Sequence, residues 1–444
     1  MNAIAQFKCS EDYQNADISY KYYRKENPDI AKVEKIVYDM KGIAHKNEFS
    51  PNAKLRCCYY PEIINEHTAH LLTNGIGFEH EGCRDKLGAD FDDVLKDIYT
   101  DALLCGTSYG YYVADEKKPH IVWLKYMNTV AILDDYSGKP AAYIYFTQIA
   151  SEKPLCVALF EPEGVTEYVR EYGEQMKVKS ERRTYTERYL SNEVEGKFFV
   201  QEAQSSAIPV FPLYALNKKS CIVGVRENVA AMDLMASQLV NNVSEAELVY
   251  WILKNYGGMD DIADSNFIVN LVKSHVIHVD DDGSAEPHQI SVPFEANSTA
   301  YARIKQLVYD NLSGVNPETL SAGNLTATAI AAAYSKQRNF SAKMESEVFK
   351  FVRGILSIAK MDSDEKLTTE YYETINVSET IQNAIASAPW LGEEETIKRL
   401  AILNGSGDRV KEIIEQRKEE QLEQFGMLQQ ASQDGLQGDN SAAQ

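Results

Sequence analysis

Two amphipathic segments of similar length flank a short block of strand-like sequence, and this order constrains the fold more than any other feature. Across 224–248, apolar residues recur every three to four positions with little turn signal, which predicts one helix roughly 37 Å long. Residues 295–313 repeat this helical spacing. Between them, 249–292 combines apolar runs with glycine and aspartate turns. The chain is therefore expected to run out along one helix, form a small mixed block and return along a second helix.

A turn-rich loop and a third helix follow this pair. Residues 314–323 begin and end with glycine, and an alanine run inside 326–360 favours a helix roughly 50 Å long if it is unbroken. Residues 376–425 predict further helices, interrupted at Pro389. The final segment, 426–444, has no apolar period, and we expect it to be disordered.

The N-terminal half changes from helical to strand-like sequence near residue 107. Apolar spacing before that point predicts helices over 29–42, 61–72 and 91–104. After it, runs rich in β-branched and aromatic residues are separated by turn sequences as far as residue 215, which predicts an antiparallel sheet or curled sandwich. Within the later mixed block, the same reasoning predicts strands at 249–256, 276–279 and 288–292 and a short helix at 265–274. The predicted fold class is α+β.

The composition is that of an acidic globular protein. The formal net charge is −21, which counts against a conventional DNA-binding surface, although solubility alone also explains it. The seven cysteines are odd in number and lack CxxC spacing, so we expect free thiols in a reducing compartment. We expect no signal peptide and no membrane-spanning helix, since no apolar run reaches the required length.

Recognisable catalytic motifs are missing from the sequence. It contains no phosphate-binding GxxxxGK[ST] loop, no GxGxxG, no GxSxG and no HExxH, so the prediction is that the protein is not an enzyme and needs no cofactor or metal. Two weaker clusters are interpreted as structural. His67 and His70 are expected to be ordinary surface or interface histidines, and the acidic residues from Asp90 to Asp101 are expected to be solvated.

The third weak cluster is the run of aspartates from Asp280 to Asp282. It resembles the start of a calcium loop, but Ser291 stands where the twelfth-position acid should be, so we expect a hairpin turn. His278 and His288 lie near this turn without an evident third ligand.

The layout as a whole resembles the portal proteins of tailed bacteriophages, in particular their siphophage-like branch. The resemblance covers roughly residues 20–420. Residues 208–213 resemble the proline-bounded strand before the first stem helix, 324–330 the start of the long helix after the tunnel loop, and 377–395 the C-terminal helical segment.

The resemblance implies a portal-type protomer with a mixed α/β wing, long stem helices, a small α/β clip and a helical C-terminal crown. The implied parts are the wing at 1–222, stem helix 1 at 223–248, the clip at 249–292, stem helix 2 at 293–313, the tunnel loop at 314–326, the long wing helix and its connection at 327–375, the crown at 376–425 and the disordered tail at 426–444.

The resemblance implies a ring of about twelve copies, and a closed cyclic ring requires heterologous contacts between its subunits. Such a ring would sit at one capsid vertex of the virion, after assembly in the host cytoplasm. It would pass double-stranded DNA without sequence specificity during packaging by the terminase large subunit, then retain and eject it. The implied partners also include a connector or adaptor protein and the capsid and scaffolding proteins, with no membrane. The alternatives are another virion structural or adaptor protein, or a metal-dependent enzyme using the acidic helix or the histidine pair.

The same resemblance assigns candidate site residues. The tunnel loop has one charged side chain among small and hydroxyl-bearing residues, which suits weak, sequence-independent DNA contact, although a plain helix connector is the other reading. Its candidates are Asn316, Glu318, Thr319, Ser321, Asn324 and Thr326. Arg303 and Lys305 are candidates for lumen charge or intersubunit pairing. The clip candidates for partner contact are Asp260, Asp261, Asp280, Asp281 and Asp282.

Overall fold

The computed structural model mixes helices and antiparallel sheets, which confirms the α+β class. It describes residues 1–38, 42–47, 50–80, 82–114, 118–194, 197–203, 207–246, 249–254, 284–289, 294–320, 327–359, 365–373, 377–403, 409–410 and 412–418. The chain forms two compact units. Unit 1 contains 1–316 and 336–372, and unit 2 contains 317–335 and 373–444.

The N-terminal part of unit 1 is a group of helices packed on one another. They are α1 (Asn2–Cys9), α2 (Glu11–Tyr23), α3 (Pro28–Ala31), α4 (Tyr59–Leu72), α5 (Gly82–Asp85) and α6 (Phe91–Cys105). Helices α2, α4 and α6 contact one another, and the hydroxyls of Ser19 and Tyr60 share a buried hydrogen bond of 2.7 Å. The helices expected at 61–72 and 91–104 are confirmed.

The helix expected over 29–42 is wrong. Helix α3 stops at Ala31, and the chain then forms a small hairpin of β1 (Ile36–Tyr38) and β2 (Ala44–Lys46). Ile36 is 54% exposed there, so the apolar spacing has no core to pack against. Helical periodicity without burial does not sustain a helix, and β-branched residues favour the extended form.

Two antiparallel sheets follow the helices, in agreement with the predicted β region. The first has the order β13–β4–β5 and the second β10–β9–β8–β7–β6. Their strands are β4 (Thr107–Val113), β5 (His120–Leu124), β6 (Thr129–Leu133), β7 (Pro140–Thr147), β8 (Leu155–Glu161), β9 (Gly164–Arg170), β10 (Lys177–Arg183) and β13 (Val210–Tyr214). Helix α6 packs on β4 and β5, and all three elements contribute residues to the main core.

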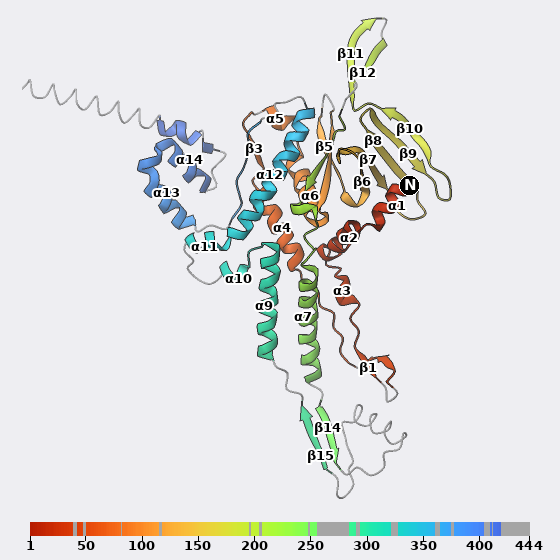
Figure 1. Cartoon of the computed structure of the whole chain (residues 1–444). Helices are drawn as coiled ribbons and strands as arrows, with labels where there is room; N and C mark the ends of the chain where they lie inside the picture. Colours follow the sequence, from red (N-terminus) through yellow and green to blue (C-terminus); the bar gives the residue numbers. More distant parts are fainter. Residues whose placement is uncertain are drawn as a thin grey trace, which may run out of the picture. The chain divides into compact units, whose positions relative to one another are not determined.

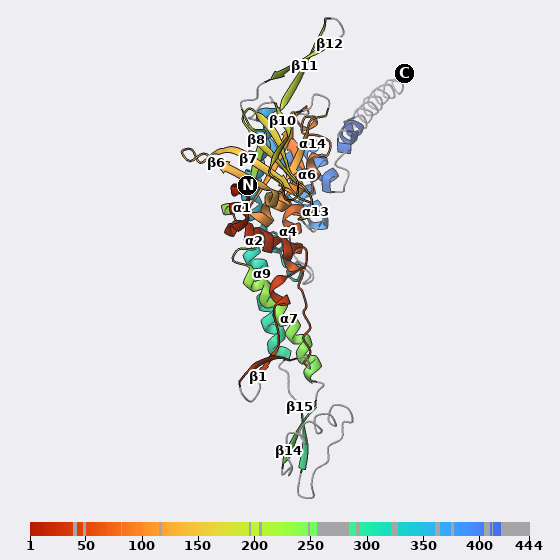
Figure 2. The ribbon, with the colours of Figure 1, turned by 90° about the vertical axis from the view of Figure 1, so that its right-hand side faces the viewer.

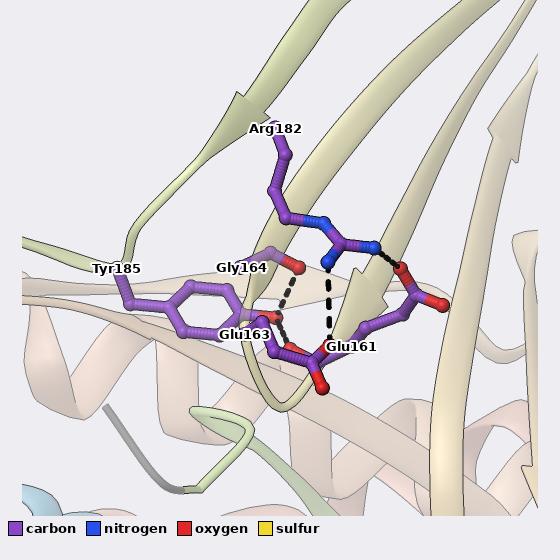
Figure 3. Close-up of polar contacts among 5 residues, drawn as sticks. All are labelled: Glu161, Glu163, Gly164, Arg182 and Tyr185. Atoms are coloured by element: carbon purple, nitrogen blue, oxygen red, sulfur yellow. Dashed lines mark hydrogen bonds and ion pairs between the residues drawn. The ribbon is translucent and has the colours of Figure 1, made fainter. Parts of the chain in front are cut away.

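A separate hairpin of β11 (Thr186–Val194) and β12 (Lys197–Ala203) leaves the larger sheet next to β10 (Figures 1 and 2). Figure 3 shows how its starting point is fixed. The Tyr185 hydroxyl donates to the carbonyls of Glu161 at 2.5 Å and Gly164 at 3.0 Å. The Arg182 guanidinium bridges the carboxylates of Glu161 and Glu163. These contacts tie the root of the hairpin to the β8–β9 turn.

The pair of long helices expected from the sequence is confirmed. Helix α7 (Arg226–Ala246) and helix α9 (Phe294–Leu312) pack side by side (Figure 1). Beyond them, β14 (Val249–Lys254) pairs antiparallel with β15 (Ser284–Gln289), so the strand expected at 288–292 begins earlier and its partner is β14. The helix expected at 265–274 and the strand expected at 276–279 lie outside the described residues.

The third helix expected over 326–360 is present but is interrupted at Tyr334. It consists of α11 (Ala327–Ala333) and α12 (Ser335–Ile358), and the boundary between the two units falls at the interruption. Helix α12 buries large residues, including Val348 and Phe351, in the core of unit 1. The alanine run of α11 has no large side chains of this kind to bury. Its high helix propensity is therefore not enough to join α11 and α12 into one continuous helix. After α12, β16 (Leu367–Thr369) pairs with β3 (Ile76–Phe78).

Unit 2 is helical where it is described. It contains α10 (Pro317–Leu320), α11, α13 (Val377–Leu391) and α14 (Glu393–Leu403), and residues 412–418 are also helical. The expected break at Pro389 is wrong, because α13 continues to Leu391 and ends where Gly392 takes a φ of +81°. Proline in a last helical turn removes only one hydrogen bond, whereas left-handed glycine terminates a helix. The tail at 426–444 lies outside the described residues.

Candidate functional site

The helix pair α7–α9 is buried at one end and exposed at the other. Val229 and Met232 on α7, and Val308 on α9, are fully buried against the rest of unit 1. Toward β14 and β15, apolar side chains stay in contact with solvent. Val240 is 41%, Val243 43% and Phe294 47% exposed there, and Leu307, near the other end of α9, is 45% exposed. Several large apolar side chains on one element pair mark a surface that associates with another protein.

A second face of α7 carries polar side chains that bind an extended segment. The carboxylate of Asp233, the hydroxyl of Ser237 and the amide oxygen of Asn241 accept hydrogen bonds from the backbone N–H groups of 57, 55 and 53, at 2.7, 2.9 and 2.7 Å. Helical residues four apart are separated by about 6 Å, and extended residues two apart by about 6.6 Å, so the two spacings match. All three polar side chains are buried.

This extended segment belongs to residues 32–58, which connect α3 to α4 and are called the arm below. Sequence reasoning missed it, because it concentrated on the apolar stripe of 224–248. The signal was present nevertheless: Asp233, Ser237 and Asn241 recur at intervals of four within that helix. Polar residues in such a row need a partner, and here the partner is backbone that forms no sheet.

The loop that follows α9 starts from a closely packed turn. Ser313 has a φ of 58°, and the Gly314 N–H donates to the Tyr309 carbonyl at 2.9 Å, which closes the helix end. A Cβ on Gly314 would lie 2.8 Å from Ile63 of α4, so the chain passes directly against that helix. The Nε2 of His67 is 2.7 Å from the Leu312 carbonyl. The root of the loop is thus anchored on α4.

Two titratable groups of α4 line this root, and burial shifts the pKa of both. Burial lowers the pKa of His67 to about 4, so the ring is neutral and its Nε2–H donates to Leu312. Burial also raises the pKa of Glu66 to about 7, although a hydrogen bond with the Val315 backbone partly offsets this. A carboxyl group with such a pKa is partly ionised near neutral pH.

Replacing Glu66 by glutamine is expected to stabilise the protein above pH 7 but not at pH 4.5. The folded-state pKa lies above the unfolded one, so the wild-type carboxyl loses its stabilising contribution as pH rises through the folded value of about 7. Glutamine cannot ionise and avoids that loss. Because the side chain is only part-buried, we expect the free energy of unfolding to rise by about 1 kcal/mol at pH 8. Urea denaturation at both pH values measures it, with the exposed Glu62→Gln on the same helix as control. An equal gain at pH 4.5 would contradict this.

The structure corrects the expectation that His67 and His70 lie on the surface. Both are 1% exposed, and they bind different partners, since the His70 Nδ1 lies 2.8 Å from the Ser341 hydroxyl of α12. Among the described residues, no group of three histidine, cysteine or acidic side chains is arranged to hold a metal ion.

The expectation that the acidic side chains of α6 are all solvated is wrong for Asp101. Its carboxylate is 1% exposed and accepts hydrogen bonds from α2, β4, β5 and the turn after β5. Asp93 and Asp97 are exposed, as expected. Asp101 therefore joins elements of the core.

The predicted loop residues do not share one environment. Asn316 is 8% exposed, and its amide donates to the Gln306 side chain at 3.0 Å, so it belongs to the packed root. Glu318 and Thr319 are exposed on α10. Ser321, Asn324 and Thr326 lie outside the described residues.

The two predicted cations on α9 also differ. Arg303 is exposed. The Lys305 ammonium lies 5.1 Å from the centre of the Tyr59 ring in a cation–π contact within the chain. The predicted clip aspartates, Asp260, Asp261 and Asp280 to Asp282, lie outside the described residues.

The sequence of the chain matches one family of proteins. The family model described as "Phage portal protein, SPP1 Gp6-like" matches residues 8–436. The match spans nearly the whole chain, and the protein therefore belongs to this phage portal family. Its function is that of a portal at the head–tail connection of a phage, and the family is structural. Among the described residues, no helix is long and apolar enough to cross a membrane.

A relative from another phage agrees with this assignment. The chain is 21% identical over 350 residues to the "Portal protein" of Clostridium phage phiCD119, covering 70% of this chain and 73% of that protein. Among solved structures, it is similar to chains from the "Neck of native GTA particle computed with C12 symmetry" and the "Neck of empty GTA particle computed with C6 symmetry". Both have a TM-score of 0.43 and 12% identity, covering 76% and 77% of this chain and 87% and 88% of theirs. The family assignment rests on the sequence match.

Proposed function

We propose that this portal protein closes into a ring of about twelve copies whose α7–α9 pairs surround a channel for double-stranded DNA. The observation that supports it is the incomplete burial of this helix pair. Val240, Val243, Leu307 and Phe294 are each more than two-fifths exposed in the single chain. Neighbouring helix pairs in a ring would cover these side chains, because a heterologous contact brings two different faces together around a closed circle.

In this proposal the parts have the roles that the portal resemblance assigned. Residues 1–222 are the wing, α7 and α9 are the stem, and β14 with β15 belongs to the clip. The clip would meet the terminase large subunit during packaging and a connector or adaptor protein afterwards. The wing would meet the capsid and scaffolding proteins at a single vertex of the virion, and the chain would be made in the host cytoplasm.

DNA would slide through this channel without being read or held. The net charge of −21 disfavours tight phosphate contact, which would stall movement. Exposed Glu318 and Thr319 of α10 are suited to weak contact from the loop, whereas buried Asn316 serves its root. Arg303, exposed on α9, is the described stem cation best placed to meet either the lumen or a neighbouring copy.

Native mass spectrometry of the purified protein, with negative-stain images of the same sample, tests this proposal. We expect rings of about twelve copies with a central hole. A compact dimer carrying stoichiometric zinc would instead favour the metal-enzyme alternative. Another closed assembly without a hole would favour the other virion-component alternative.

Exchanging residues 317–323 for a glycine–serine linker of equal length is expected to leave rings intact and to reduce packaged DNA at least about tenfold. The exchange spares Gly314 and Asn316, which pack against Ile63 and Gln306. Packaged DNA is expected to fall because a flexible linker does not hold its residues at a fixed position relative to the DNA. Nuclease-protected DNA per particle measures the effect. The same exchange in the exposed turn at 134–138 is the control. Loss of rings would show that the loop is structural.

A further inference from the structure

The chain leaves unit 1 after Asn316 and re-enters it at Lys336, and both crossing points contact the same face of α9. The Asn316 amide donates to the Gln306 side chain at 3.0 Å, and the Lys336 ammonium donates to the Asp310 carboxylate at 2.5 Å. Gln306 and Asp310 are four residues apart, so they are neighbours on the helix surface, with about 5–6 Å between their Cβ atoms. The segment 317–335 therefore starts and ends beside a single turn of α9.

The two contacts differ in burial and in charge. Asn316 is 8% exposed, and its hydrogen bond joins two neutral amides. The side chains of Lys336 and Asp310 are 58% and 37% exposed. Salt screens an exposed ion pair, and such a pair contributes little free energy, so it opens and closes readily. The chain is thus firmly anchored where the segment starts and held by an adjustable contact where it ends.

Both charges of the ion pair have the unfavourable sign for their own helix. Asp310 lies in the last turn of α9, where the partial negative charge of the helix C-terminus favours a base. Lys336 is the second residue of α12, where the partial positive charge of the N-terminus favours an acid. Across the contact the signs are favourable, since the carboxylate of Asp310 meets the start of α12 and the ammonium of Lys336 meets the end of α9. Local helix stability does not account for these two charges, whereas their attraction to each other does.

The next anchors of α12 lie directly after this ion pair. Gln337 is 1% exposed, and the Phe340 ring lies 4.3 Å from the His67 ring of α4, measured between ring centres. From Gln337 onwards α12 is thus held by the core of unit 1. The ion pair acts on the short stretch between this anchor and α11, so opening it leaves the core of unit 1 intact.

We propose that the Asp310–Lys336 ion pair is a latch that closes the return end of the segment 317–335 and thereby positions α10, the element assigned above to weak DNA contact. The DNA part of this inference rests on the proposed function, whereas the closing of the latch does not. With the latch closed, both ends of the segment are held one helical turn apart on α9. With the latch open, the contact of Asn316 holds the starting end alone. Asp310 and Lys336 are positioning residues, because they act on DNA only through the segment whose ends they join.

Charge reversal tests the latch, because ion pairing and helix polarity predict opposite results. Asp310→Lys places a base at the end of α9, and Lys336→Asp places an acid at the start of α12. Each single variant would therefore stabilise its own helix if the ion pair had no role. If the latch exists, each single variant brings two like charges together and opens it. The double variant Asp310→Lys with Lys336→Asp restores opposite charges and is expected to close the latch again.

Hydrogen exchange of peptides covering α11 and the first two turns of α12 measures the opening, with the protein kept below its assembly concentration. We expect exchange at least about threefold faster in either single variant, and at the wild-type rate or slower in the double variant. Salt at about 1 M should speed exchange in the wild type, since it shortens the Debye length to about 3 Å. Lys343→Asp, at an exposed position about two turns further along α12, is the matched control and should exchange like the wild type.

Nuclease-protected DNA per particle is the second measurement. It should fall at least about threefold in either single variant and recover in the double variant, with ring formation unchanged. If both single variants exchange at the wild-type rate or slower, helix polarity dominates and the latch is wrong, while the ring proposal stands. If exchange follows the charges but packaged DNA does not, the positioning role is wrong. If the wild type forms no rings, the proposed function fails, and the exchange rates still decide whether the latch exists.

Discussion

Asp101→Ala is expected to lower the free energy of unfolding by about 3–5 kcal/mol, because several buried donors would lose one shared acceptor. The four shortest of these hydrogen bonds come from the Tyr20 hydroxyl at 2.6 Å, the Ser108 hydroxyl at 2.7 Å, the Tyr126 N–H at 3.0 Å and the Trp123 indole N–H at 3.1 Å. These donors come from α2, β4, β5 and the turn that follows it. Alanine offers them no oxygen and leaves a small cavity, and water has no open route to a site that is 1% exposed.

Urea denaturation followed by tryptophan fluorescence measures this loss, with the protein kept below its assembly concentration. Asp97→Ala is the matched control, since it removes an exposed carboxylate one helical turn earlier on α6. The control should stay within about 0.5 kcal/mol of the wild type. Equal denaturation midpoints for the two variants would show that the Asp101 network does not stabilise the fold.

Gly106→Ala is expected to destabilise the protein by about 3 kcal/mol or more, since it combines backbone strain with a steric clash. Gly106 ends α6 with a φ of +89°, where it connects the helix to β4. A Cβ there would lie 2.7 Å from the Lys218 carbonyl oxygen and 2.9 Å from the Lys219 carbonyl carbon. Both are backbone atoms, and they cannot rotate away as the end of a side chain can. The Ala215 N–H also donates to the Gly106 carbonyl at 3.0 Å, so a shift of this turn would strain β13 as well.

Gly138→Ala separates the two contributions. Gly138 has a φ of +64°, but nothing lies within 4 Å of the position its Cβ would take. This variant should therefore lose only the conformational part, about 1 kcal/mol. Thermal unfolding of the two variants side by side is the measurement. If Gly106→Ala destabilises the protein no more than Gly138→Ala does, the backbone of residues 218–219 moves aside to accommodate the added Cβ, and the expected clash is wrong.

Some features of the candidate site could be predicted from the local sequence, and others could not. The stem pair follows from local sequence, and so does the exposure of Glu318 and Thr319 after Pro317. The burial of Asn316 could not be predicted in that way, because its partner Gln306 lies on α9 and the two meet only when the chain turns at Ser313. The arm was similarly hidden: its hydrogen-bond partners on α7 are more than 170 residues further along the chain.

By itself, the sequence determined the helices α4, α6, α7 and α9 and the run of antiparallel strands, because apolar periodicity and turn residues act over short distances. It also carried the order of elements that places the chain in the phage portal family. Only the tertiary structure decided which polar residues are buried. Asp101 and His67 occupy positions that their own helices would leave to solvent, and they become internal because distant elements bring donors or acceptors to them. The same holds for 29–42, where helical spacing gave way to a strand because no core lay beside it.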